Sequence, residues 1–96
     1  MNLLYSSEAL ADLVRLRDFI SEHNPQAASR IAKDLVKRIT CLEEFPEMGV
    51  GVAEAPDPDT LRDLIVGRYV VRYALHAETI FILRIWHGYE DRGRGA

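Results

Sequence analysis

Apolar residues recur at helical spacing through the first half of this chain and at closer spacing through its last third. The short apolar run from Leu3 to Tyr5 predicts an opening strand, and Ser6 or Ser7 is suited to cap the helix that follows. This helix, about Ser7 to Glu22, is amphipathic. Its apolar stripe is Ala9, Leu13, Leu16 and Ile20, and its polar side is Asp12, Arg15, Asp18 and Glu22.

A second helix is predicted to begin at Asn24-Pro25, because asparagine caps helices and proline fits the first turn, where no amide donor is needed. This helix ends before Pro46. Its apolar stripe is Ala28, Ile31, Ala32, Leu35, Ile39 and Leu42. Two helices joined by so short a turn should pack side by side as an antiparallel hairpin.

The chain from Phe45 to Thr60 holds three prolines and two glycines without periodicity, which predicts a loop. Three apolar runs follow between Leu61 and Gly88, separated by Gly67-Arg68 and by His76-Ala77-Glu78. Short apolar runs joined by turns predict an antiparallel meander. The expected fold is therefore α+β: a two-helix hairpin packed on one face of a small antiparallel sheet of three to four strands, with residues 3–5 as an added strand.

The register of the last two strands follows if residues 76–78 form their turn. Leu75 then faces Thr79, and one face receives a uniformly large apolar set, as a core face should. That set pairs Tyr73 with Phe81, Val71 with Leu83 and Tyr69 with Ile85. A slip of one residue would bury Arg84 beside Tyr69, which favours the first register. Arg72 and Arg84 are thus expected on the opposite face, away from the helices, together with Val70, Ile80 and Ile82.

Composition predicts a single domain, residues 1–96, with 48% hydrophobic and 28% charged residues. The one cysteine, Cys41, excludes an internal disulfide. No apolar run is long enough to span a membrane and no signal-peptide pattern follows Met1, so a cytoplasmic location is expected. The three histidines lack the spacing of zinc ligands, and neither a metal nor a cofactor is expected.

The charge of the chain constrains its function more than its composition does. The net charge is −3 with a pI near 5.5, which disfavours sequence-independent binding to nucleic acid. The basic residues after Arg38 are all arginines, and four of them lie in the meander. The candidate binding residues are these arginines and the end of the last strand: Arg62, Arg68, Arg72, Arg84, Trp86 and His87.

Each candidate arginine can also be explained by a purely structural role. Arg62 is suited to pair with Asp63 or an acidic loop residue, and Arg68 in a turn is usually solvated. Arg72 and Arg84 on one face suit a salt-bridge lattice as well as a docking site, because clustered charge is only probabilistic evidence for function.

The order of several short motifs resembles the RelE/ParE toxin superfamily, and in particular its ParE-like, plasmid-stabilisation branch. The resemblance spans nearly the whole chain, and its motifs are specific in their order and spacing although each alone is weak. They are Ser6-Ser7-Glu8-Ala9, Asn24-Pro25-x-Ala27-Ala28, Leu42-x-x-Phe45-Pro46-x-Met48-Gly49, Leu61-Arg62, Val66-Gly67-Arg68-Tyr69, Val71-Arg72-Tyr73 and Ile82-Leu83-Arg84-Ile85-Trp86-His87-Gly88.

This resemblance implies the toxin of a type II toxin–antitoxin system. Its partner would be a cognate antitoxin, whose binding segment is flexible when free and folds on the toxin. That segment is expected on the outer apolar residues of the sheet, Val70, Ile80 and Ile82, and on the outer sides of both helices. The ParE-like branch is associated with poisoning of DNA gyrase, so gyrase is the expected target and direct nucleic-acid binding is not expected.

The RelE-like branch suggests an alternative, a ribosome-dependent mRNA interferase. RNA cleavage needs a base for the 2′-hydroxyl, a cation for the phosphorane-like state and an acid for the leaving oxygen. Arg72 and Arg84 could supply cations, and His87 or Tyr89 the acid–base function. Against this, RelE-like chains are strongly basic, whereas this chain is acidic and has no lysine after Lys37. A third interpretation is a decayed, non-toxic homologue that binds antitoxin.

Overall fold

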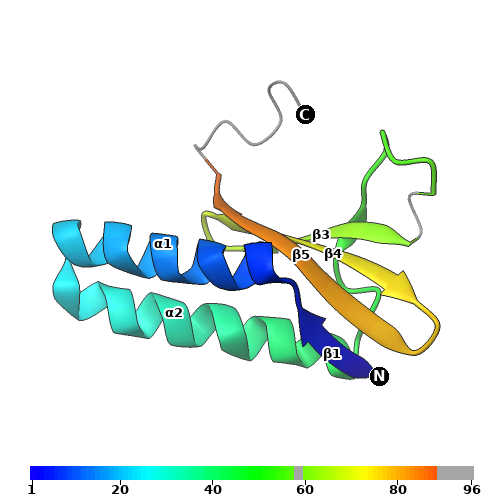
Figure 1. The fold of residues 1–96 in the computed structure, drawn as a ribbon, viewed down its shortest axis with the longest axis horizontal. Helices are drawn as coiled ribbons and strands as arrows, with labels where there is room; N and C mark the ends of the chain where they lie inside the picture. Colours follow the sequence, from blue (N-terminus) through cyan, green and yellow to red (C-terminus); the bar gives the residue numbers. More distant parts are fainter. Residues whose placement is uncertain (58–59, 89–96) are drawn as a thin grey trace.

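The computed structural model describes residues 1–57 and 60–88, and its elements follow the predicted order (Figure 1). The helical half consists of β1 (Asn2–Tyr5), α1 (Ser7–His23), α2 (Pro25–Thr40) and a short 3-10 helix (Cys41–Glu43). The remaining strands are β2 (Val50–Gly51), β3 (Leu61–Val66), β4 (Tyr69–His76) and β5 (Thr79–His87). Among the described residues no helix is long and apolar enough to cross a membrane.

Both helices begin where the sequence predicts and for the predicted reason. Ser6 Oγ accepts a hydrogen bond from Ala9 N at 2.9 Å, and Asn24 Oδ1 accepts one from Ala27 N at 3.2 Å, with Pro25 in the first turn of α2. The two helices run antiparallel along one face of the sheet (Figure 1). Most of their apolar residues meet the strands in the main core, and a second, smaller cluster holds Ile20, Ala27 and Ala28. The main core includes Leu16, Leu35, Ile39, Val71, Tyr73 and Ile85.

Within the described residues the sheet has five strands in the order β1-β5-β4-β3-β2, one more than the upper end of the predicted range. Strands β3, β4 and β5 form the predicted antiparallel meander, but β1 pairs with β5 in parallel, so the sheet is mixed. Strand β2 lies within the segment predicted as a loop, where Val50 and Gly51 pair with Asp63 and Arg62. Two residues are too few to produce a periodic signal, which is why the sequence did not reveal this strand.

The predicted register of β4 and β5 is wrong along its whole length: the pairs are one residue out from the turn to Tyr73 and two residues out beyond it. His76 pairs with Thr79, so the turn consists of Ala77 and Glu78, with Ala77 in the left-handed region at φ 55°. This pairing reverses the faces expected for the first half of β5. Ile80 and Ile82, which the prediction placed on the outer face, are fully buried in the core.

A β-bulge then returns β5 to the expected alternation. Tyr73 pairs with Ile82 but Arg72 pairs with Arg84, so Leu83 is an extra residue on β5. A bulge adds one residue to one strand and therefore reverses which side chains face the core beyond it. A slip of one residue without a bulge would bury Arg84, and the bulge removes that conflict. Arg72 and Arg84 share the outer face of the sheet, as predicted, and lie directly opposite each other.

Candidate functional site

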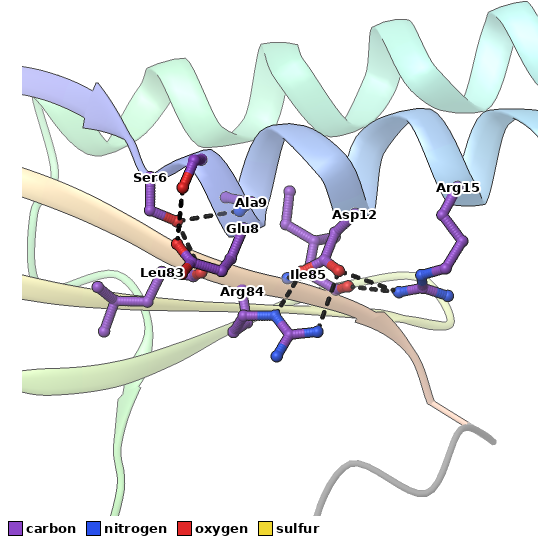
Figure 2. A network of polar contacts seen from close by, with 9 residues as sticks. Ser6, Glu8, Ala9, Asp12, Arg15, Leu83, Arg84 and Ile85 are labelled. Atoms are coloured by element: carbon purple, nitrogen blue, oxygen red, sulfur yellow. Dashed lines mark hydrogen bonds and ion pairs between the residues drawn. The ribbon is translucent and has the colours of Figure 1, made fainter.

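Helix α1 covers the edge of β5 beyond the point where β1 ends (Figure 2). Strand β1 pairs with β5 only along residues 79–82. Farther along, Ser6 Oγ donates to Leu83 O at 2.9 Å and Arg15 Nη2 donates to Ile85 O at 3.3 Å. Side chains of α1 thus take the place of a neighbouring strand and satisfy backbone groups that an open sheet edge would expose.

Asp12 is at the centre of this edge (Figure 2). Only 4% of the residue is exposed. Its carboxylate accepts from Ile85 N at 2.9 Å, from Arg84 Nε and Nη2 at 2.8 and 3.1 Å, and from Arg15 Nη2 at 3.3 Å. Burial raises the pKa of Asp12, but the hydrogen bonds from Arg84, Ile85 N and Arg15 outweigh burial and hold the pKa below its usual value. The carboxylate is therefore ionised at neutral pH, with both oxygens bonded.

The prediction that Asp12 lies on the polar side of α1 is wrong. Asp12 comes three residues after Ala9 and four before Leu16, so it belongs to the buried stripe of the helix. Helical spacing alone could have revealed this. An aspartate is rarely buried unless it is paired, so its place in an apolar stripe signals a partner elsewhere in the fold.

A stack of two arginines and a tryptophan covers part of the outer face of the sheet. The Cζ atoms of Arg72 and Arg84 lie 5.2 and 5.9 Å from the centroid of the Trp86 ring, within cation–π range. Asp63 on β3 accepts from Arg72 Nε and Nη2 at 2.9 and 3.0 Å, a bidentate pair. With Asp12 bonded to Arg84, five residues form one connected set. We call Asp12, Asp63, Arg72, Arg84 and Trp86 the arginine–tryptophan cluster.

Pairing within this cluster determines its chemistry. It holds two guanidinium groups and two carboxylates, so their formal charges cancel. The hydrogen bond to Asp63 raises the pKa of Arg72 above its ordinary value. Arg72 and Arg84 thus form the ion pairs that the structural interpretation predicted. A carboxylate at one side and the Trp86 ring beneath hold each guanidinium plane in a fixed orientation. This arrangement suits recognition of a polar surface more than stabilisation of a developing negative charge.

Arg62 lies apart from the cluster. It pairs with Tyr73 across β3 and β4 and therefore faces the helices. Its Nη1 donates to Gly49 O at 2.7 Å and to Glu47 O at 3.3 Å, and its Nη2 lies 3.7 Å from the Glu47 carboxylate. This confirms the structural interpretation in which Arg62 binds an acidic loop residue.

The other candidate residues are distributed around the end of the sheet. His87 pairs with Tyr69, and their rings meet edge to face at 5.2 Å on the side of the helices. Arg68 lies in the turn between β3 and β4 and lines a pocket of about 310 Å³ against α2. Tyr89 lies outside the described residues. The structure therefore brings Arg72, Arg84 and Trp86 together and places Arg62, Arg68 and His87 elsewhere.

The described residues, 1–57 and 60–88, hold no candidate metal centre. Within those ranges no three histidine, cysteine, aspartate or glutamate side chains are arranged to hold a metal ion. The polar groups of the cluster are instead bonded to one another.

The sequence and the fold of this chain are similar to those of known proteins. A family model described as the ParE toxin of the type II toxin–antitoxin system, parDE, matches residues 3–92. Two proteins of Caulobacter vibrioides are similar in sequence. Toxin RelE2 is 40% identical over 86 residues, covering 88% of this chain and 92% of that protein. Toxin RelE1 is 33% identical over 94 residues, covering 94% of this chain and 96% of that protein. A solved structure titled "Chromosomal ParDE TA system from P. aeruginosa" matches with a TM-score of 0.77 and 25% identity, covering 91% of this chain and 95% of that one.

Proposed function

This chain belongs to the ParE toxin family of type II toxin–antitoxin systems, and on that basis we propose that it acts by binding and poisoning DNA gyrase. As a member of the family it is the toxin of such a system, with a cognate antitoxin as its partner. The choice between a protein target and RNA depends on the chemistry of the arginine–tryptophan cluster.

The observation that carries the proposal is the pairing of both candidate catalytic arginines with carboxylates. Arg72 is bonded to Asp63, and Arg84 to Asp12. A phosphate that approached either guanidinium would also meet the adjacent carboxylate. Two unit charges about 4 Å apart near a protein surface interact by about 4 kcal/mol. Each carboxylate therefore offsets much of the attraction that its arginine would offer to RNA.

The position of His87 supports the same choice. An acid or base for RNA cleavage must reach the phosphodiester that the cations hold. His87 faces the helices, whereas Arg72 and Arg84 lie on the outer face of the sheet. Successive strand residues face opposite sides, so these three side chains do not converge on one substrate position.

The mRNA interferase is the second candidate, favoured by the names of the two Caulobacter relatives and by the exposure of Arg84, whose side chain is 46% exposed. Under this hypothesis Arg72→Ala with Arg84→Ala abolishes RNA cleavage outright, whereas target binding by a gyrase poison weakens by degrees. A decayed toxin predicts instead that expression of the chain leaves growth unaffected.

We place the antitoxin on the outer sides of the two helices. Ile80 and Ile82, which were expected to contribute, are in the core, and Val70 on the outer face of the sheet is 5% exposed. A folding segment gains affinity by covering exposed apolar surface. The exposed apolar side chains of the helices include Leu10, Val14 and Val36.

A supercoiling assay tests the proposal. Purified gyrase, ATP and relaxed plasmid are incubated with and without the chain, and again with antitoxin added. We expect loss of supercoiling or accumulation of linear DNA, relieved by the antitoxin. An inactive result with folded toxin in excess, together with ribosome-dependent mRNA cleavage that the double arginine variant abolishes, would replace gyrase poisoning with the interferase.

A further inference from the structure

The segment Phe45–Val50 exposes large apolar side chains close together. Phe45, Met48 and Val50 are 60%, 38% and 63% exposed. Phe45 and Met48 are the ends of one turn, closed by a 3.1 Å hydrogen bond from Met48 N to Phe45 O. Val50 follows after one buried residue and lies in β2 at the edge of the sheet. Single exposed hydrophobic residues are ordinary, but a group of them within one short loop marks an interaction site.

Two side chains from the sheet fix the backbone of this Phe45–Val50 loop. The hydroxyl of buried Tyr73 donates to Pro46 O at 2.7 Å and accepts from Gly49 N at 2.9 Å. Arg62 donates to Gly49 O at 2.7 Å and to Glu47 O at 3.3 Å. Because the protein satisfies these backbone groups, the loop conformation is set before a partner arrives, which reduces the entropy lost on binding.

Close approach to the sheet explains the glycine in this loop. A Cβ at Gly49 would lie 2.8 Å from the ring and hydroxyl of Tyr73 and 2.9 Å from Asp63 O. The loop is therefore pressed against the sheet at its middle. The apolar side chains on either side of Gly49 face solvent.

Charge around the loop is mostly of one sign. The sequence from Cys41 to Asp57 contains no lysine, arginine or histidine and carries the carboxylates Glu43, Glu44, Glu47, Glu54 and Asp57. Cations approach this segment from other parts of the described chain: Arg62 reaches the Glu47 carboxylate at 3.7 Å, the Met1 ammonium group lies 3.4 Å from Glu43 O, and Arg72 interacts electrostatically with Glu54. An acidic surface of this kind repels phosphate groups and attracts basic protein surfaces.

We propose that the Phe45–Val50 loop is a preformed docking site for the target protein. The surface of the target that binds the loop is basic and has apolar pockets for Phe45 and Met48. The proposal rests on the proposed function, because it requires that the toxin acts on a protein. Apolar anchors surrounded by charged residues match the arrangement of protein interfaces, in which an apolar centre lies within a polar rim. The antitoxin occupies a different surface, on the helices, so the two activities are separable.

The variant Phe45→Ser/Met48→Ser tests the anchors, with Phe19→Ser as a matched control because Phe19 is 53% exposed on α1. Three quantities are measured: growth inhibition on expression, the toxin concentration that half-inhibits gyrase supercoiling, and the affinity for antitoxin by calorimetry. The double variant should need at least tenfold more protein to inhibit gyrase, the scale expected for losing interface anchors. Its affinity for antitoxin should stay within twofold of wild type. Phe19→Ser should match wild type in its effect on gyrase.

Two further variants test how the rigidity and the charge of the loop affect gyrase inhibition, without changing Phe45 or Met48. Tyr73→Phe keeps every exposed side chain but removes both hydroxyl contacts to the loop, so it should weaken gyrase inhibition severalfold. Glu44→Lys should weaken gyrase inhibition at low ionic strength. The difference from wild type should decrease as added salt screens the charges. Glu22→Lys on α1 is the control for a charge reversal placed elsewhere.

The outcomes distinguish this inference from the proposed function. If wild type inhibits gyrase and the double serine variant inhibits it equally well, the loop is not the docking site and gyrase poisoning stands. Loss of antitoxin affinity in that variant would also overturn the inference, because the loop would then belong to the antitoxin surface. If wild type stops growth without inhibiting gyrase and the variant does not stop growth, gyrase is the wrong target and the docking site is supported. A wild type that inhibits neither gyrase nor growth would overturn both.

Discussion

Replacing Asp12 by alanine should destabilise this protein far more than loss of an ordinary surface ion pair. The substitution leaves the buried amide of Ile85 without an acceptor, which costs about 1–3 kcal/mol. It also removes ion pairs to Arg84 and Arg15, whose side chains are nearly half exposed, so together they add no more than about 1 kcal/mol. The free energy of unfolding should therefore fall by about 1–4 kcal/mol, a substantial part of the roughly 5–15 kcal/mol typical of such domains.

Urea denaturation followed by circular dichroism measures this loss. The midpoint should fall while the m value stays unchanged, because the surface exposed on unfolding is the same. Asp18→Ala is the matched control: Asp18 lies exposed on the same helix, 3.5 Å from Arg17, and its removal should cost no more than about 0.5 kcal/mol. A loss below about 1 kcal/mol for Asp12→Ala would show that this carboxylate is not needed to complete the edge of β5.

The pH dependence of stability gives an independent check on Asp12. Its folded pKa lies below the unfolded value of about 3.9, so ionisation stabilises the fold above about pH 4. That contribution is lost as the pH falls through the folded pKa. Asp12→Asn lacks this titration. The free energy of unfolding of wild type should therefore exceed that of the variant by a constant amount above about pH 5, and by an amount that shrinks below about pH 4. A margin that widens on acidification would contradict the sign of the pKa shift.

Three further changes in unfolding free energy can be measured in the same urea experiment. Ser6→Ala removes the cap of α1 and the bond to Leu83 O, and should cost about 1–2 kcal/mol; a loss of a few tenths would show that the cap contributes little. Tyr73→Phe leaves two loop groups without their partner and should cost about 1–3 kcal/mol, whereas an unchanged midpoint would mean that water replaces the hydroxyl. Gly67→Ala meets no atom within 4 Å but forces alanine to φ 60°, so it should cost about 1 kcal/mol, and Gly67→Asn should cost less; equal losses would contradict a backbone origin.

Sequence patterns alone were enough to predict both helices and their first residues, the antiparallel meander, and the side of the sheet that carries Arg72 and Arg84. These features are local. A cap needs only a side-chain acceptor three residues before the amide it binds, as at Ser6 and Asn24. A helix stripe or a strand alternation repeats within a few residues, so the pattern can be read without knowing what packs against it.

Other features depend on contacts with residues distant in the chain, and local sequence patterns do not predict them. Strand β2 exists because Val50 and Gly51 meet β3, and nothing in their own sequence requires a strand. The two-residue turn and the bulge at Leu83 act as a pair: each alone would put one set of side chains on the wrong face, and together they bury Ile80 and Ile82 while keeping Arg84 outside.

The same distinction explains the candidate site. Arginines are visible in the sequence, but whether their charge faces a substrate or an internal carboxylate depends on contacts across 72 positions from Arg84 to Asp12 and 9 from Arg72 to Asp63. Asp12 is held in the apolar stripe of α1 because the open edge of β5 supplies an amide and an arginine beyond the end of β1, and only the folded chain brings that edge to the helix.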